Sequence, residues 1–139
     1  MASIHETATA ASEKAIRILL VDDAGSVRRA LRLVLSGEPD LRVIGEAADG
    51  EQAVRRAHDL HPDIIVMDLE LPGINGLDAT RRIKASGEGC AIIMLSAWGG
   101  DAIRNAAARA DIALFIEKGE HLDDLAGIIR ALHARNNPS

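Results

Sequence analysis

Apolar residues follow two different periods along the chain, one typical of buried strands and the other of amphipathic helices. The runs typical of strands are Ile16–Val21, Leu41–Ala48, Asp63–Asp68, Ala91–Leu95 and Ala113–Ile116. The stretches typical of helices follow them in turn and begin at or near Ser26, Asp49, Leu77, Asp101 and Leu122. Ser26 and Asp49 are expected to cap the first two helices, because their side-chain oxygens can accept a hydrogen bond from a free backbone N–H.

Strands that alternate with helices in this way predict parallel βαβ units with right-handed crossovers. The runs at 16–21, 63–66 and 91–95 are apolar except for Arg17 and Asp63, as expected for strands covered on both faces of a sheet. We therefore expect an α/β fold, a doubly wound parallel sheet of about five strands. Residues 16–135 would form this one domain, with a flexible tail at 1–15 and a second tail or the start of a linker at 136–139.

The composition excludes several classes of function. Phe115 and Trp98 are the only aromatic residues, so the chain has no platform for stacking single-stranded nucleic acid. There are 16 Lys and Arg against 21 Asp and Glu, a net charge of −5, and we expect no direct nucleic acid binding by this domain. A single cysteine, Cys90, suits a reducing compartment, and no apolar run is long enough to span a membrane. These features favour a cytoplasmic domain without membrane contact.

Polar side chains stand directly after four of the five predicted strands: Asp22, Asp23, Asp68, Ser96 and Lys118. Ligands of such sheets bind beyond the carboxyl ends of the strands, so these side chains are expected to meet at one edge. Three carboxylates in one place repel one another and favour a bound cation, and ligands that are all oxygen favour a hard ion such as Mg²⁺. The hydroxyl and the ammonium group suit phosphoryl oxygens held by that ion.

Four motifs make the chain resemble the receiver domains of two-component response regulators. They are ILLVDD at 18–23, DLELPGINGLDATRRI at 68–83, MLSA at 94–97 and FIEKG at 115–119. The resemblance extends from about Ile16 to Ala134. The segment DLRVIGEAADGEQAV at 40–54 is similar in particular to receivers joined to the helix-turn-helix output domains of nitrate and quorum regulators. The resemblance implies the flavodoxin-like strand order 2-1-3-4-5.

The resemblance also implies where phosphorylation would occur. Asp68 would accept a phosphoryl group from the phosphohistidine of a sensor histidine kinase or a phosphotransfer protein, or from a small phosphodonor. Asp22, Asp23 and Asp68 would hold Mg²⁺ together with the backbone carbonyl of Glu70.

Further roles implied by the resemblance concern how the signal would spread from the site. Ser96 and Lys118 would each contact a phosphoryl oxygen. Phe115 would turn inward as Ser96 moves, which would change the face formed by the fourth helix, the fifth strand and the fifth helix. A homodimer formed through this face on phosphorylation is a family-level expectation.

The chain departs from the family pattern at a few positions. Gly119 stands where many receivers have a cis-proline, and the turn before the last strand begins at Asp111 rather than at glycine. Aspartate tolerates a left-handed turn better than most residues, so we expect the register of that strand to survive. Glu70 and Trp98 lie at variable positions that are expected to influence the rate of dephosphorylation.

Three functions remain open from the sequence. The leading hypothesis is a phosphorylation-controlled switch, which would regulate transcription if joined to an output domain and would otherwise act as a stand-alone signalling protein. It would not be an enzyme beyond transferring and hydrolysing its own phosphoryl group. The alternatives are a scaffold that never uses its phosphate and a Mg²⁺-dependent phosphohydrolase. His58 and His61, three residues apart, are interpreted as solvated helix residues rather than a metal pair.

Overall fold

A computed structural model describes residues 15–119 and 122–137, and every structural statement below concerns these residues. The strands are β1 (Ile16–Val21), β2 (Leu41–Ala47), β3 (Ile64–Asp68), β4 (Ala91–Ser96) and β5 (Leu114–Glu117). The helices are α2 (Gly25–Leu35), α3 (Gly50–Leu60), α4 (Gly76–Ala85), α5 (Asp101–Arg109) and α6 (Leu125–Asn136), with a 3-10 turn η1 (Leu122–Asp124). All strand pairs are parallel and the order is β2-β1-β3-β4-β5, which confirms the predicted order.

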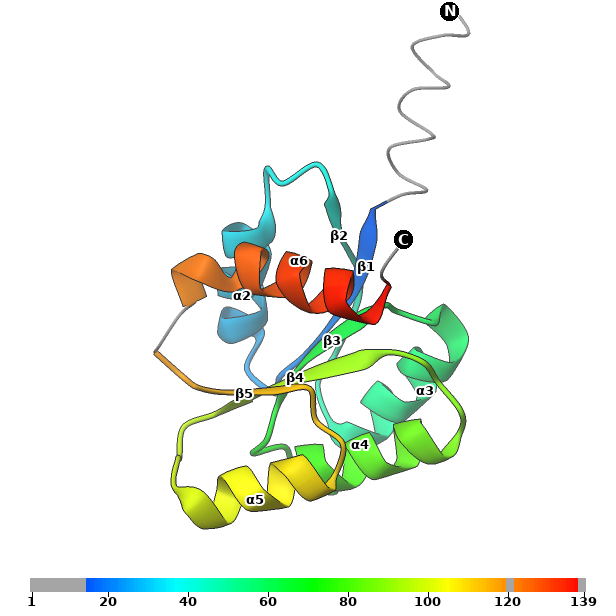
Figure 1. Cartoon of the computed structure of the whole chain (residues 1–139), viewed down its shortest axis with the longest axis vertical. Coiled ribbons are helices and arrows are strands. Elements are labelled where there is room, and N and C mark those ends of the chain that lie inside the picture. The colour runs from blue at the N-terminus through cyan, green and yellow to red at the C-terminus, as the bar shows by residue number, and fades with distance from the viewer. Residues whose placement is uncertain (1–14, 120–121, 138–139) are drawn as a thin grey trace, which may run out of the picture.

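The sheet is covered on both faces, as the apolar strands predict. Helices α2 and α6 lie on one face, and α3, α4 and α5 lie on the other (Figure 1). Each face has its own apolar core, one including Leu31 and Ile129 and the other including Ala57 and Ile83. Strands β3 and β4 are buried along their whole length, because successive side chains of a strand point into opposite cores.

The helix caps agree with the sequence in one case and differ in the other. Asp49 caps α3 as predicted, its side chain accepting a hydrogen bond from Gln52 N at 2.8 Å. The prediction for Ser26 was wrong, because α2 begins at Gly25 with Ala24 at the cap position. The carboxylate of Asp22 accepts from Ala24 N at 2.9 Å and turns the chain two residues earlier than a serine cap would.

The end of the chain also differs in detail. The predicted helix from Leu122 is divided into η1 and α6, and α6 continues to Asn136, so residue 136 belongs to a helix rather than to a tail. The predicted tail at 1–15 lies outside the described residues except for Ala15, and so do residues 138–139. No helix in the described part of the chain is long and apolar enough to cross a membrane.

Two backbone positions set how α4 and β5 lie against their neighbouring strands. A Cβ atom on Gly76 would lie 2.6 Å from the carbonyl oxygen of Asp68 and 2.8 Å from the sulfur of Met94, so only glycine allows α4 to start this close to β3. Asp111 has a φ of +65°, the left-handed turn that the sequence predicts before β5. The turn keeps β5 in register with β4, pairing Phe115 with Met94.

Candidate phosphoacceptor site

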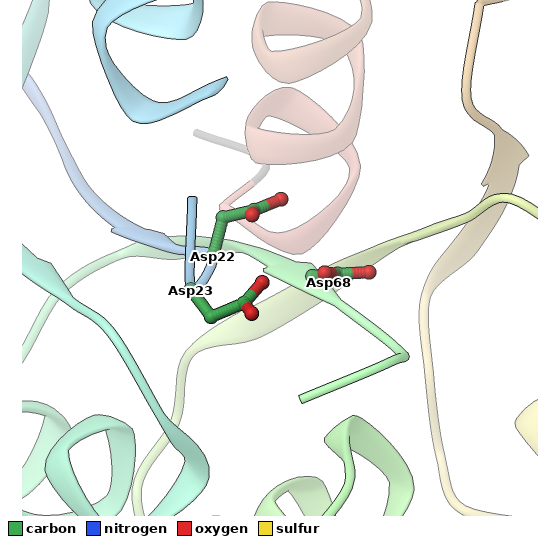
Figure 2. A group of neighbouring side chains, drawn as sticks. All are labelled: Asp22, Asp23 and Asp68. Carbon is green, nitrogen blue, oxygen red and sulfur yellow. The ribbon is translucent and has the colours of Figure 1, made fainter. Parts of the chain in front are cut away.

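Three carboxylates meet at the carboxyl ends of β1 and β3. Figure 2 shows Asp22 and Asp23 at the end of β1 beside Asp68 at the end of β3. Each of the three side chains offers an oxygen within 4.8 Å of the others. Asp22 is 1% and Asp68 2% exposed, whereas Asp23 is exposed to solvent. The structure therefore brings together the three acidic residues that the sequence places after different strands.

Lys118 joins the two buried carboxylates. Its Nζ lies 3.2 Å from Asp68 Oδ2 and 3.3 Å from Asp22 Oδ2. The other oxygen of Asp68 accepts a hydrogen bond from Glu70 N at 3.1 Å. Burial raises the pKa of Asp68, the negative charge of Asp22 raises it further, and Lys118 only partly opposes them, so that it reaches about 6. Burial also works to lower the pKa of Lys118, but the charges of Asp68 and Asp22 outweigh it and the pKa lies above its usual value.

One buried oxygen of the site has too few partners. Asp22 Oδ2 has no hydrogen bond, and Lys118 reaches it only as an ion pair. Because a buried carboxylate oxygen is normally hydrogen-bonded, this oxygen is suited to a cation. The donors are all oxygen, the set that Mg²⁺ prefers. The residues present therefore fit a hard divalent ion.

The end of β4 completes the site. Ser96 is fully buried, and its hydroxyl donates to Glu70 Oε2 at 2.6 Å and accepts from Trp98 N at 3.0 Å. The second oxygen of Glu70 accepts from Ala97 N at 3.0 Å. From the sequence we expected Glu70 to contribute its backbone carbonyl to the Mg²⁺ site and to influence dephosphorylation, but not that its side chain would contact the end of β4. The sequence did hold a signal for this contact. Glu70 follows Asp68 by two residues, and the neighbouring strand ends in Ser96, followed by the small residue Ala97, and both leave space for a carboxylate.

Phe115 lies half-buried on β5 against the core that includes Ile103 of α5. The guanidinium carbon of Arg104 is 5.0 Å from the centre of its ring, a cation–π distance. Arg104 also donates to Glu117 Oε1 at 3.3 Å. One arginine of α5 thus holds the aromatic ring and the end of β5 together.

His58 and His61 lie away from this site on α3 and at its end. Both side chains are largely exposed, at 72% and 68%, which agrees with the interpretation as solvated residues. His61 Nδ1 lies 2.8 Å from a carboxylate oxygen of Glu88.

Sequence comparison places this arrangement in a known family. Residues 18–130 match the response regulator receiver domain. The chain belongs to the response regulator receiver family. The receiver is 33% identical over 119 residues to the response regulator GacA of Pseudomonas viridiflava, covering 86% of this chain and 56% of that protein. It is 38% identical over 116 residues to the transcriptional regulatory protein LiaR of Bacillus subtilis, covering 84% of this chain and 55% of LiaR.

Solved structures support the same assignment. A two-component response regulator of the LuxR family from Aurantimonas sp. SI85-9A1 matches with a TM-score of 0.82 and 35% identity, covering 87% of this receiver and 86% of that chain. The response regulator domain of Thermotoga maritima CheB matches with a TM-score of 0.77 and 32% identity, covering 90% of this receiver and 98% of that domain. The resemblance seen in the sequence, including its similarity to LuxR-type regulators, is confirmed. The receiver spans about half the length of GacA and LiaR.

Enzymes occur among the relatives, but the shared part is small. A protein-glutamate methylesterase/protein-glutamine glutaminase of Nocardioides sp. is 40% identical over 81 residues, which are 22% of that protein. What the chain shares with this Nocardioides enzyme is therefore confined to about a fifth of the enzyme's length.

Proposed function

We propose that this receiver, which we assign to residues 16–136, is a switch controlled by phosphorylation of Asp68. The observation that carries the proposal is the placement of Asp68, a buried carboxylate with Lys118 on one oxygen and Asp22 and Asp23 beside it. The partners are a sensor histidine kinase or a phosphotransfer protein. We expect no direct nucleic acid binding by this domain, because the chain carries a net charge of −5.

The reaction transfers a phosphoryl group from the phosphohistidine of the partner to the carboxylate of Asp68. An oxygen of Asp68 forms a bond to phosphorus while the phosphorus–nitrogen bond of the phosphohistidine breaks, and the departing nitrogen keeps the electron pair and takes up a proton from solvent. Asp22, Asp23, Asp68 and the backbone carbonyl of Glu70 would hold Mg²⁺, whose charge would neutralise that of the transferring group. Lys118 and Ser96 provide the donors for phosphoryl oxygens.

The consequence of phosphorylation would appear on the face formed by α5, β5 and α6. Lys118 N donates to Ser96 O at 2.6 Å, which ties the phosphoryl-contacting strand β4 to the end of β5. Phe115 lies on β5 next to Leu114, which is 37% exposed, and Trp98, two residues beyond the end of β4, is 66% exposed. A change at Ser96 and Phe115 would alter this face, through which we propose that phosphorylated copies dimerise or contact an output domain.

Trp98 allows a direct test, because it is the only tryptophan and lies two residues from Ser96. Acetyl phosphate or phosphoramidate with Mg²⁺ should add one phosphoryl group to the intact mass and change the tryptophan fluorescence. Asp68→Asn should abolish both effects, whereas Asp59→Asn, a change at an exposed aspartate of α3, should leave both intact. No added mass with either donor would overturn the switch and favour a scaffold. Hydrolysis of unrelated phosphate esters that survives Asp68→Asn would favour a phosphohydrolase.

A further inference from the structure

The carboxylate of Glu70 binds the two polar hydrogens at the end of β4. Its Oε2 accepts from the Ser96 hydroxyl at 2.6 Å, and its Oε1 accepts from Ala97 N at 3.0 Å. Each carboxylate oxygen therefore has one donor, an arrangement that binds an anion through two parallel hydrogen bonds. Glu70 itself lies in an exposed loop, so nothing in its burial explains why its side chain turns inward to this place.

The same two hydrogens lie where a phosphoryl group on Asp68 would need them. Strand β4 runs beside β3, and Asp68 is paired with Leu95, directly before Ser96 and Ala97. A phosphoryl group on Asp68 carries oxygens that must find donors in a largely buried site. Lys118 and the Glu70 N–H already contact the carboxylate of Asp68, and the Ser96 hydroxyl and the Ala97 N–H are further donors at this edge.

A hydrogen that is given to one acceptor is not available to another. The Ser96 hydroxyl has a single hydrogen, given to Glu70, while its oxygen already accepts from Trp98 N at 3.0 Å. The Ala97 backbone also has a single hydrogen. Both donors must therefore leave Glu70 before they can bind a phosphoryl oxygen. The contacts of Glu70 and those of the phosphoryl group exclude each other.

We propose that Glu70 is a positioning residue that occupies the donors of the phosphoryl site and so opposes phosphorylation of Asp68. This inference rests on the proposed function and assigns the Glu70 side chain a role in it. The chemistry that replaces Glu70 is that of a tetrahedral oxyanion covalently attached to Asp68. On phosphorylation the Glu70 carboxylate is released to solvent, and the loop that carries Trp98 changes its hydrogen bonds at the same step.

Two variants separate competition for donors from simple charge repulsion. Glu70→Gln removes the charge and, with one acceptor oxygen, can satisfy only one of the two donors. Glu70→Asp keeps the charge but is one methylene shorter and loses its reach to β4. The rate of phosphorylation by acetyl phosphate, followed by intact mass at fixed Mg²⁺, should rise about tenfold in both variants, the effect of losing one charge-assisted hydrogen bond. In a Ser96→Ala background the gain should be smaller, because one of the two donors is already absent.

The outcomes distinguish this inference from the proposed function. A gain for Glu70→Gln with none for Glu70→Asp would mean charge repulsion and overturn the competition. Equal rates for both variants and the unmodified protein would also overturn it, while Asp68 would stand as the phosphoacceptor. If neither the unmodified protein nor any variant acquires a phosphoryl group, the proposed function is wrong, and so is the proposed competition between Glu70 and the phosphoryl group.

A second measurement needs neither Mg²⁺ nor a phosphodonor. In the NMR spectrum the amide proton of Ala97 should move upfield in Glu70→Gln and Glu70→Asp, because its hydrogen bond to a carboxylate is lost or weakened. Glu51→Gln is the matched control, an exposed glutamate on α3 that accepts a hydrogen bond from Arg82. An Ala97 resonance unchanged in both Glu70 variants would overturn the inference even if their phosphorylation rates differ.

Discussion

Asp68→Asn should stabilise the protein when Mg²⁺ is absent, although it removes the proposed phosphoacceptor. Burial, with the neighbouring charge of Asp22, raises the pKa of Asp68 from 3.8 to about 6 in the folded protein. The folded state therefore keeps the Asp68 proton to a higher pH than the unfolded state. Stability is lost as the pH rises between these two values, and above about pH 6 the full penalty of the buried carboxylate remains.

The size of the effect follows from the shift. A rise of about two pK units corresponds to about 3 kcal/mol, since one unit is worth about 1.4 kcal/mol. The rim of the site is open at Lys118, whose side chain is 30% exposed, and solvent there reduces the penalty. We therefore expect a gain of about 1–2 kcal/mol for Asp68→Asn near neutral pH.

Urea denaturation near neutral pH with a chelator present measures this gain, and Asp59→Asn on the surface of α3 serves as the control. The difference between the unmodified protein and Asp68→Asn should shrink as the pH falls from about 6 and vanish below about pH 4, where both states come to hold the proton. Added Mg²⁺ should stabilise the unmodified protein more than the variant. A variant that is less stable than the unmodified protein, or a difference that does not depend on pH, would refute the reasoning.

Two further substitutions test the surroundings of the site. Gly76→Ala should destabilise the protein by about 1–3 kcal/mol in urea denaturation, because its Cβ would lie 2.6 Å from a backbone oxygen, whereas Gly89→Ala, which meets nothing within 4 Å, should change little. An equal effect of the two would contradict this explanation. Arg104→Ala should free the ring of Phe115 and lower the acetyl phosphate concentration that half-saturates the Trp98 response about twofold to fivefold, the size of one exposed cation–π contact. Arg109→Ala, at an exposed arginine of the same helix, is the control, and an identical response in both variants would count against a restraining role for Arg104.

The architecture could be predicted from the sequence because its signals are local and repeated. Continuous apolar strands such as Ile64–Asp68 can only lie inside a sheet with two covered faces, and that sheet brings the residues at its strand ends to one edge. Asp22, Asp68 and Lys118 meet for this reason. The strand order came from the resemblance to a family rather than from the pattern of apolar residues.

Features that depend on competition between neighbouring groups could not be predicted. Ser26 is a good cap residue, yet the carboxylate of Asp22 takes the earlier N–H of Ala24 and starts the helix sooner. The direction of the Glu70 side chain depends on two donors 26 and 27 residues away along the chain. Residue preferences describe single positions, whereas these outcomes depend on which of several acceptors lies closest in the folded chain.

The close approach at Gly76 has a mechanical consequence for signalling. The start of α4 lies so close to the carbonyl oxygen of Asp68 and the sulfur of Met94 that no side chain fits between them at Gly76. On the other side of the site, Ser96 is followed directly by the exposed residues Ala97 and Trp98, whose backbone N–H groups donate to the side chains of Glu70 and Ser96 respectively. If Asp68 is phosphorylated as proposed, we therefore expect the resulting displacement to pass through β4 toward α5 and β5 rather than toward α4.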